Sequence, residues 1–390
     1  MKWEMVKLGK ICGTTSGGTP SRTKNEFWDN GNIPWIKSGQ LKDSNIYEAE
    51  EFITPLGLKN SSSKLIPAGT LLLALYGATA GKLGFLEIEA TLNQAICALT
   101  PNESLLSNRY LFYYLLSIRK KIIEDSAGGA QPNISQKYVQ EIEIPLPPLS
   151  IQQKIAAILD KADALRRKDQ ELLKKYDDLA QAIFIDMFGD PVRNEKGWES
   201  DSFENLFETR LGKMLDAKKQ NGNFKYKYLG NSNVQWFKFN LENLAEMEFD
   251  EKDIKIFSLR KGDILICEGG EVGRAAIWND EMQNVFFQKA IHRARIKTDY
   301  ITPEFTVMLF WFLAKYGGLK DYVTTSTISH LTGEKLKTIQ IPLPPYKQQV
   351  KFSQMINSLN VQRMVLDKSF KTTETLFQSL LQAAFKGELV

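Results

Sequence analysis

The stretch Ile144-Pro145-Leu146-Pro147-Pro148 decides the fold, because the chain contains it twice. Residues 341–345 repeat it letter for letter, and the ungapped alignment continues well beyond each copy. Along that alignment Gln152 matches Gln349, and Phe188 matches Phe385. A duplication of this length predicts two copies of one structural plan, each ending in the same kind of segment.

Length and composition favour two globular domains with connecting segments. A chain of 390 residues is longer than one hydrophobic core usually organises. Hydrophobic residues make up 43% and charged residues 25%, as in water-soluble proteins. No uninterrupted apolar run reaches the roughly eighteen residues of a membrane span, and the start lacks the apolar core of a signal peptide. We therefore expect a cytoplasmic protein without membrane contact.

The repeat predicts four consecutive parts. Residues 1–143 form a first α/β domain, and residues 191–340 form a second one that retraces it more loosely. Residues 144–190 and 341–390 each join a proline lead-in to a long helix. The expected fold class is α+β, with two duplicated α/β domains separated by two long antiparallel helices that form a coiled coil with pseudo-twofold symmetry.

Inside the first domain, short apolar runs alternate with turn-forming clusters. Glycine, proline and serine gather at residues 14–22, which predicts loops. Residues 71–76 and 93–99 have the pattern of buried strands, and residues 108–125 have that of a helix. In the second domain, residues 303–316 form the corresponding helix.

Each proline lead-in is followed by an amphipathic helix. Ser150, with Gln153 three residues on, has the pattern of a capping box and predicts a helix start there. Apolar residues then recur at the four-three spacing of a coiled-coil seam, interrupted by Asp169. Helices of about 35–40 residues would reach on the order of 55 Å. Such long one-sided stripes need a partner, so the two helices should pack together; the alternative is that each folds back on its own domain.

The residues expected in this helix–helix contact are apolar or aromatic and fall on one stripe of each helix. They are Ile151, Ile155, Ile158, Leu165, Leu172, Tyr176, Leu179 and Ile183 in the first helix, and Phe352, Met355, Leu359, Leu366, Leu376 and Leu380 in the second.

The sequence contains none of the common catalytic constellations. Cys12, Cys97 and Cys267 lie far apart and outside CxxC spacing, so we expect buried reduced thiols. With two histidines in the chain, a histidine-rich metal site is excluded, and no metal is predicted. Carboxylates paired at a telling spacing are absent as well. These observations favour a binding protein over an enzyme.

Two glycine-rich loops resemble nucleotide-binding motifs without matching them. Residues 77–82 end in Gly-Lys, but the first glycine is one residue too close, and Leu83 stands where Ser or Thr must hold a metal. Residues 269–273 lack the spacing of the dinucleotide fingerprint. Both are better interpreted as turns between strands.

The order and duplication of these features resemble the DNA sequence-specificity subunits of type I restriction-modification systems. The resemblance covers essentially the whole chain. It rests on the repeated PLPP…Q lead-ins, on SGGTPS at residues 16–21, on IPWI at residues 33–36 and on FGDP at residues 188–191. The second domain departs from the family pattern at its start, where residues 209–213 replace the Gly-Gly-Thr-Pro turn.

The resemblance implies a non-catalytic subunit. Each target-recognition domain would read one half of a bipartite, asymmetric site in double-stranded DNA, while the helices would fix the gap and dock two methylation subunits. Cofactors would belong to the partners: S-adenosylmethionine to the methylation subunits, ATP and Mg²⁺ to the restriction (motor-nuclease) subunits. A rigid helical spacer suits two half-sites about one DNA turn, roughly 34 Å, apart.

The residues expected to contact DNA are polar, basic or aromatic and lie in predicted loops. They are Thr19, Ser21, Arg22, Lys37, Ser38, Tyr76, Thr79, Lys82, Asn93 and Gln94 in the first domain, and Lys213, Lys225, Tyr226, Lys227, Asn231, Asn233, Glu268, Arg274, Gln288 and Lys289 in the second. Arginine and lysine suit guanine edges, asparagine and glutamine suit adenine edges, and lone lysines more often meet phosphate. For each residue, the alternative is a solvated loop position.

Two rival functions make different predictions. A fused or type II-like restriction-methylation subunit would cleave or methylate DNA by itself. A helical adaptor would bridge proteins without selecting any DNA sequence.

Overall fold

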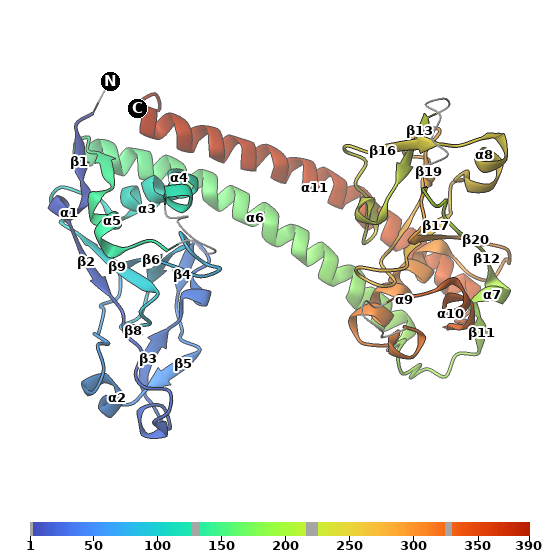
Figure 1. The fold of residues 1–390 in the computed structure, drawn as a ribbon, viewed down its shortest axis with the longest axis horizontal. Helices are drawn as coiled ribbons and strands as arrows, with labels where there is room; N and C mark the ends of the chain where they lie inside the picture. The colour runs from blue at the N-terminus through green and yellow to red at the C-terminus, as the bar shows by residue number, and fades with distance from the viewer. Residues whose placement is uncertain (1–2, 126–132, 216–224, 324–329) are drawn as a thin grey trace. The chain divides into compact units, whose positions relative to one another are not determined.

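A computed structural model describes residues 3–125, 133–215, 225–323 and 330–390. The chain divides into two compact units, Met1–Gln170 with Lys368–Val390 and Glu171–Asp367. Each unit contains one α/β domain together with portions of two long helices (Figure 1). The segments 144–190 and 341–390 are therefore each divided between the two units.

The first unit is built on a five-stranded sheet. In spatial order its strands are β2 (Cys12–Ser16), β9 (Ile96–Pro101), β6 (Leu71–Ala74), β7 (Leu83–Leu86) and β4 (Ser44–Ile46). β6 pairs antiparallel with both neighbours, and all four of its residues are buried. Burial on both faces explains why this strand is an unbroken apolar run. β6 and β9 are the strands predicted at 71–76 and 93–99; β6 is shorter and β9 begins three residues later.

A second, three-stranded sheet carries the loops of the candidate site. In spatial order its strands are β5 (Glu51–Ile53), β3 (Ile33–Ile36) and β8 (Thr91–Leu92). The central strand β3 is antiparallel to β5 and parallel to β8. The remaining elements of this domain are β1 (Met5–Lys7), α1 (Leu8–Ile11), η1 (Asn25–Phe27), η2 (Ser38–Gln40), α2 (Pro55–Lys59), α3 (Asn108–Ser117), α4 (Arg119–Asp125), α5 (Gln136–Glu141) and β10 (Glu143–Pro145).

The helix predicted at 108–125 is two helices. The hydroxyl of Ser107 caps α3 by accepting the N–H of Tyr110. Ile118 then takes φ −100° and ψ 7°, which ends α3 before α4 begins. The six residues from Tyr110 to Leu115 are all buried, because α3 is enclosed by the sheet on one side and a long helix on another.

The second unit repeats this plan. Its four-stranded sheet has the order β12 (Phe207–Leu211), β20 (Ile291–Ile296), β17 (Ile264–Cys267) and β18 (Ala275–Ile277), and its three-stranded sheet has the order β16 (Ala245–Glu248), β13 (Lys225–Leu229) and β19 (Phe286–Phe287). The other elements are β11 (Ser200–Ser202), α7 (Phe203–Leu206), η4 (Asn231–Asn233), β14 (Val234–Gln235), β15 (Lys238–Phe239), α8 (Glu251–Phe257), α9 (Pro303–Lys315), η5 (Lys320–Tyr322), α10 (Gly333–Thr338) and β21 (Gln340–Pro342). α9 corresponds to α3, with Thr302 as its cap.

Both proline lead-ins are short strands. β10 pairs antiparallel with β1, and β21 pairs antiparallel with β11. Pro145 thus lies opposite Met5, and Pro342 lies opposite Ser200. The repeated motif therefore closes each domain by returning the chain to the strand at which that domain began.

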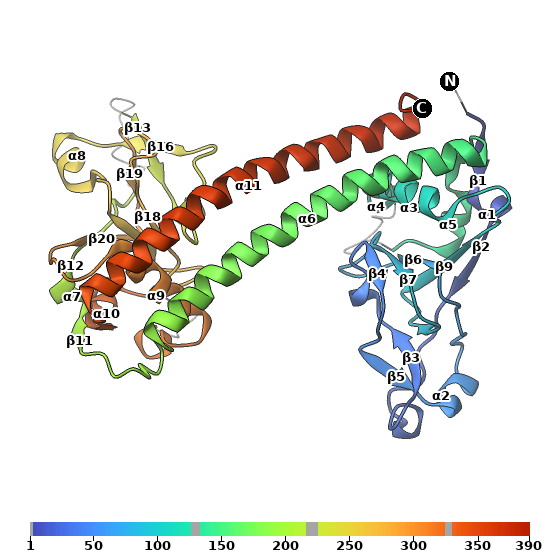
Figure 2. The same ribbon diagram turned by 180° about the vertical axis from the view of Figure 1, so that it is seen from behind.

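The long helices that follow are α6 (Leu149–Phe188) and α11 (Tyr346–Lys386), of 40 and 41 residues or about 60 Å each. The carbonyl of Pro148 accepts the N–H of Gln152 at 3.1 Å and so starts α6. The N-cap is therefore Pro148, and the predicted capping box at Ser150 is wrong. Figure 2 shows the two helices as continuous ribbons.

The helices run antiparallel in each unit. Arg166 of α6 pairs with Glu374 of α11 at 3.1 Å in the first unit. Arg363 of α11 pairs with Asp177 of α6 at 3.0 Å in the second. These two pairs occupy equivalent positions in the internal repeat, so each unit contains the same kind of ion pair between the helices.

The buried stripe differs from the predicted seam. On α6, Ile155 is buried, whereas Ile158, Leu165 and Leu179 are exposed. On α11, Phe352 is buried, whereas Met355 and Leu376 are exposed. The remaining predicted positions are half-buried: Ile151, Leu172, Tyr176, Ile183, Leu359, Leu366 and Leu380.

The shift of the stripe has a packing cause. Leu159 on α6 and Phe377 and Leu381 on α11 are buried in one core with α3. In the first unit, each long helix therefore packs against α3 and against the other helix at the same time. Because each helix has contacts on two sides, the residues that are buried differ from the a and d positions of a two-stranded coiled coil.

Candidate nucleic-acid interface

In the first unit, the candidate site begins where β2 ends. The N–H of Gly17 donates to Ile96 O at 3.1 Å, and the N–H of Gly18 donates to Leu92 O at 2.8 Å. A Cβ at position 17 would lie 2.1 Å from the carbonyl oxygen of Asn93, so the loop can lie this close only because it has glycine there. The close approach brings Thr19 to Gln94, and the Thr19 hydroxyl donates to the Gln94 side chain.

Two tryptophans hold the loop that follows. The indole N–H of Trp35 donates to Gly18 O at 3.0 Å, and that of Trp28 donates to Ser21 O at 3.1 Å. The guanidinium of Arg22 lies 3.7 Å from the centre of the Trp28 ring. Arg22 is therefore fixed by stacking, although half of its side chain remains exposed.

Two glutamates complete this arrangement. Glu51 accepts Arg22 Nη1 at 2.5 Å and Lys37 Nζ at 2.9 Å, and Glu50 accepts Lys37 Nζ at 3.0 Å. Burial acts to raise the pKa of the Glu51 carboxyl, but hydrogen bonds and charge from Arg22 and Lys37 outweigh it and lower that pKa. The hydrogen bonds that the Lys37 ammonium donates to Glu51 and Glu50 raise the pKa of Lys37. Glu51 and Lys37 are therefore both charged at neutral pH.

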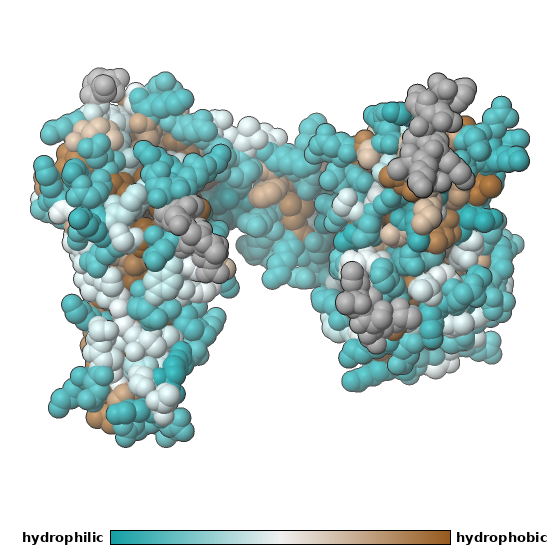
Figure 3. Space-filling view, viewed as in Figure 1, coloured by the Kyte–Doolittle hydropathy of each residue, from teal (hydrophilic) through white to brown (hydrophobic). Residues whose placement is uncertain are grey.

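Arg22, Lys37 and Glu50 are among the residues that line an open hollow of about 550 Å³. Six of the predicted DNA-contact residues lie together there: Thr19, Arg22, Lys37, Ser38, Asn93 and Gln94. On the face shown in Figure 3, the part of this unit that carries β3, β5 and α2 is teal at its sides and white in the middle, with a small brown patch near its lower end. A hydrophilic hollow with two cations and two amides has the donors and acceptors needed to contact base edges and phosphates.

The other four predicted residues of this domain lie outside the lining of the hollow. The hydroxyl of Ser21 hydrogen-bonds to Thr23 at 2.9 Å. Tyr76 is close to Gln94; burial raises the pKa of Tyr76, and a hydrogen bond with Gln94 partly offsets that rise. Thr79 lies in the turn before Lys82, and Lys82 pairs with Asp43 at 3.1 Å.

Sequence reasoning missed Trp28, Glu50 and Glu51. A signal existed for the tryptophan, because Arg22, Trp28, Trp35 and Lys37 interleave basic and aromatic residues. No comparable signal marked the glutamates, because only the pairing of β5 with β3 brings Glu51 beside the two cations.

The second domain reaches the same backbone arrangement with different residues. The N–H of Gly212 donates to Ile291 O at 3.0 Å, and that of Lys213 donates to Phe287 O at 3.1 Å. A Cβ at position 212 would lie 2.2 Å from Gln288 O. Gly212 thus takes the place of Gly17, even though the sequence around it departs from the Gly-Gly-Thr-Pro pattern.

Two predicted cations of the second domain are engaged in internal contacts. Lys213 Nζ donates to Glu248 O at 2.6 Å and to the carboxylate of Asp253. The side chain of Arg274 is only 13% exposed, and its Nη2 donates to Asn231 O at 2.7 Å. These contacts stabilise loops, which leaves less of either cation available for a polyanion.

The remaining predicted residues of this domain are structural or exposed. Asn231 Nδ2 donates to Gly269 O at 2.9 Å, and Asn233 Oδ1 accepts the N–H of Gly230 at 2.8 Å. The N–H of Glu268 donates to Ala290 O at 2.9 Å. Tyr226 packs on Phe249 and Phe286. The backbone of Gln288 forms an isolated parallel β-bridge with that of Lys213. The exposed cations are Lys225, Lys227 and Lys289.

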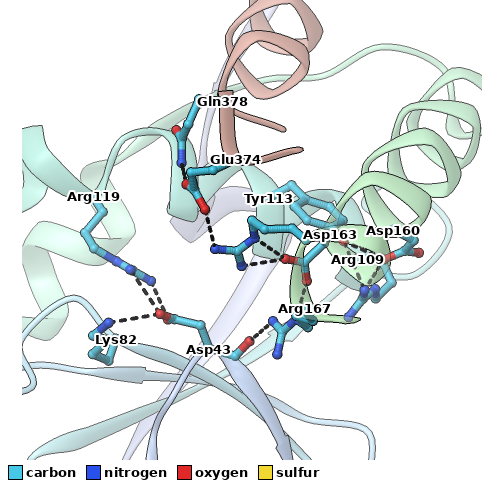
Figure 4. Close-up of polar contacts among 11 residues, drawn as sticks. Asp43, Lys82, Arg109, Tyr113, Arg119, Asp160, Asp163, Arg167, Glu374 and Gln378 are labelled. Atoms are coloured by element: carbon cyan, nitrogen blue, oxygen red, sulfur yellow. Dashed lines mark hydrogen bonds and ion pairs between the residues drawn. The ribbon is translucent and has the colours of Figure 1, made fainter. Parts of the chain in front are cut away.

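A polar network joins the first domain to the long helices (Figure 4). The Asp43 carboxylate accepts Lys82, Arg119 and the N–H of Leu83, while its backbone carbonyl accepts Arg167 of α6. Asp43 has φ 60°, a left-handed conformation that points its carbonyl and its carboxylate to different partners.

The network continues along the helices. Arg167 Nε donates to Asp163 at 2.6 Å, and Asp163 also accepts Arg166 at 2.6 Å. Arg166 in turn reaches Glu374 of α11 at 3.1 Å. A continuous chain of charges therefore links the five-stranded sheet to both helices, and the sequence pattern predicted none of it.

The described ranges contain no helix that is both long and apolar enough to cross a lipid bilayer. Within the same residues, no group of three or more histidine, cysteine or carboxylate side chains is placed to hold a metal ion. All three cysteines are buried as free thiols, and burial raises the pKa of Cys12 and Cys97 to about 12.

Comparisons with known proteins agree with this architecture. The sequence profile described as "Type I restriction modification DNA specificity domain" matches residues 1–175 and 195–361. The EcoR124I/EcoR124II specificity subunit of Escherichia coli is 34% identical over 183 residues, which is 46% of this chain and 45% of that protein. The MjaIX specificity subunit of Methanocaldococcus jannaschii is 25% identical over 422 residues, 99% of this chain and 93% of that protein.

Solved structures share the fold. A crystal structure of the type I restriction-modification S subunit from M. genitalium has a TM-score of 0.60 at 15% identity, covering 98% of this chain and 96% of the other. A chain from a study of complex assembly and conformational transition of the type I restriction-modification system has a TM-score of 0.53 at 18% identity, covering 100% and 98%. Since the family profile matches both halves of the sequence, this chain belongs to the family of type I restriction-modification DNA specificity subunits.

Proposed function

We propose that the two domains read the two halves of a bipartite, asymmetric site in double-stranded DNA. The hollow around Arg22 carries this proposal, because it brings six predicted contact residues together from separate loops. The matching positions of Gly17 and Gly212 support it, since they frame corresponding loops in the two domains. One chain would then present two different reading surfaces on one repeated scaffold.

The chemistry of the first hollow suits direct readout. A guanidinium can donate two parallel hydrogen bonds to O6 and N7 of guanine, and the amides of Asn93 and Gln94 can pair with N6 and N7 of adenine. Lys37, a flexible point charge, suits phosphate.

The long helices would set the gap between the half-sites and dock the partners. Three apolar residues of α11 are highly exposed at helical spacing: Val361 at 64%, Met364 at 73% and Val365 at 69%. A contiguous apolar stripe on a helix favours burial by another protein. We assign this stripe to the docking of methylation subunits. Two methylation subunits would join the complex and bind S-adenosylmethionine, and the motor-nuclease subunits would use ATP and Mg²⁺. In this scheme the chain itself is a non-catalytic cytoplasmic subunit.

The test is selection from a random DNA pool. The chain, assembled with its methylation partners, is incubated with random duplexes, and bound DNA is sequenced. Enrichment of a two-part motif with a fixed gap supports the proposal. Binding without enrichment favours an adaptor, and cleavage or methylation by the purified chain alone favours a fused enzyme; either result overturns it.

A further inference from the structure

In the second unit, α9 and the two long helices surround a cavity of about 270 Å³. Aromatic side chains form much of its wall, with an ion pair at one side. Residues that define it are Tyr176, Ala180, Trp236, Phe237, Trp311 and Arg363. The DNA-reading role assigned above uses none of these side chains.

The first unit shows what fills the same place in the other copy. The alignment that pairs Phe188 with Phe385 also pairs Ala180 with Phe377 and Arg363 with Arg166. Phe377 is buried, and the Arg166 guanidinium lies 4.9 Å from the centre of its ring. Tyr113 packs on the same ring, with the ring centres 6.2 Å apart. An aromatic ring thus occupies this position in one half of the molecule.

In the second unit the ring is missing, Met308 of α9 stands where α3 has Tyr113, and the arginine–carboxylate pair is retained. Ala180 has only a methyl group where Phe377 has a phenyl ring. Arg363 still pairs with the carboxylate of Asp177 at 3.0 Å, as Arg166 pairs with Glu374, and it lines the cavity. The cavity therefore offers a cation and apolar walls to a flat ring, which are the surroundings that stabilise Phe377.

The outer wall of the cavity is held under backbone strain. Phe237 has φ 64°, a left-handed conformation that a bulky residue rarely adopts. The Trp236 indole N–H donates to Glu271 Oε1 at 2.6 Å, and the N–H of Phe237 donates to Ala275 O at 3.1 Å. These bonds keep two aromatic rings at the cavity at a conformational cost, and such strain tends to occur at ligand-binding positions.

We propose that this cavity binds a small planar aromatic molecule, which takes the place that the Phe377 ring occupies in the first unit. The cavity is large enough, because an apolar cavity of about 150 Å³ in another protein binds benzene. The ligand would lie over Arg363 and between the indole rings of Trp236 and Trp311. The inference stands on the internal repeat and does not depend on DNA reading.

Indole is the probe, and its binding to the full-length chain is measured by isothermal titration calorimetry. Wild-type protein should bind indole saturably at one site. Ala180→Phe should fill the cavity, reduce indole affinity at least tenfold and raise the melting temperature. Phe377→Ala should open the equivalent cavity in the first unit and bind a second indole molecule.

Two further variants keep the test decisive. Ala180→Leu fills less volume and serves if circular dichroism shows that Ala180→Phe does not fold. Ala314→Phe obstructs the adjacent hollow of about 820 Å³, which shares Trp236 and Trp311, and should leave indole binding unchanged. The proposal is overturned if wild-type protein does not bind indole saturably, or if folded Ala180 variants bind it as well as wild type.

Discussion

The buried side chain of Gln152 accepts a hydrogen bond from the backbone N–H of Ser107 at 2.8 Å and so ties the start of α6 to the start of α3. The same amide donates to Leu105 O and Pro147 O, each at 2.8 Å. Gln349 repeats all three bonds in the second unit. The glutamine of the repeated PLPP…Q motif is thus the joint between proline lead-in, domain and long helix.

Replacing Gln152 with alanine should destabilise the first unit. Three buried backbone groups would lose their partner, and we expect a loss of roughly 2–4 kcal/mol in the free energy of unfolding. Urea denaturation measures it. Gln153→Ala, at an exposed neighbouring position, is the control and should change stability little. Equal stability of the two variants would contradict the role given to Gln152.

Replacing Gly17 with alanine should disrupt the candidate interface. The new Cβ would lie 2.1 Å from Asn93 O and 2.3 Å from Leu92 O, so the loop must move away from the β8–β9 connection. We expect about 1–3 kcal/mol of destabilisation and weaker DNA binding. Gly39→Ala is matched to it, because a Cβ at position 39 meets nothing within 4 Å. Similar melting curves and DNA affinities for both variants would count against the close-approach argument.

Replacing Arg22 with alanine should relax sequence selection at one base position. Loss of a bidentate contact to a base costs about 1–3 kcal/mol in discrimination at that position. Selection from random DNA with the assembled complex provides the readout. Lys24→Ala removes a nearby exposed cation and should preserve the selected motif. A uniform loss of affinity for all sequences would identify Arg22 as a phosphate contact instead.

Replacing Lys37 with alanine should weaken DNA binding without altering the selected motif. A phosphate contact contributes equally to all sequences and releases a counterion, so the slope of log affinity against log salt should fall by about one. Fluorescence anisotropy over a range of salt concentrations measures this slope. A changed motif in the selection experiment would show that Lys37 reads a base.

Asp43 should make stability depend on acid pH. Burial acts to raise the pKa of its carboxyl, but Arg119, Lys82 and the Leu83 N–H together lower it below the ordinary value of 3.8. A lowered folded-state pKa stabilises the protein above the unfolded-state value, and this stabilisation is lost as pH falls through the folded-state pKa.

The comparison with Asp43→Asn isolates this effect. At neutral pH the variant should be less stable by about 2–3 kcal/mol, because Arg119 loses a half-buried ionic partner. Between about pH 5 and pH 2 the difference from wild type should shrink. Chemical denaturation at a series of pH values measures the difference in stability. Glu124→Gln, which removes the carboxylate of an exposed ion pair with Lys120, is the control. A difference that does not vary with pH would contradict the ionic role of Asp43.

The duplication, the two α/β domains and the two long helices could be predicted from the amino-acid sequence. These follow from local properties: a repeated letter pattern, apolar periodicity and turn-forming residues, all of which act within short stretches of chain. For the same reason Thr19, Arg22, Asn93 and Gln94 could be predicted to lie in loops, whereas only the structure brings these loops together.

The availability of individual side chains for DNA depends on tertiary contacts and could not be predicted in this way. Lys82, Lys213 and Arg274 are, like Arg22, basic residues in predicted loops, yet each is engaged by a group distant in sequence. Lys82 pairs with Asp43, Lys213 pairs with Asp253, and Arg274 donates to Asn231 O. The buried stripe of the long helices and the cavity beside Ala180 likewise depend on packing between elements that are distant in sequence. Such pairings arise only when the chain closes on itself, because the energy of a buried charge or ring depends on the neighbours that folding brings to it.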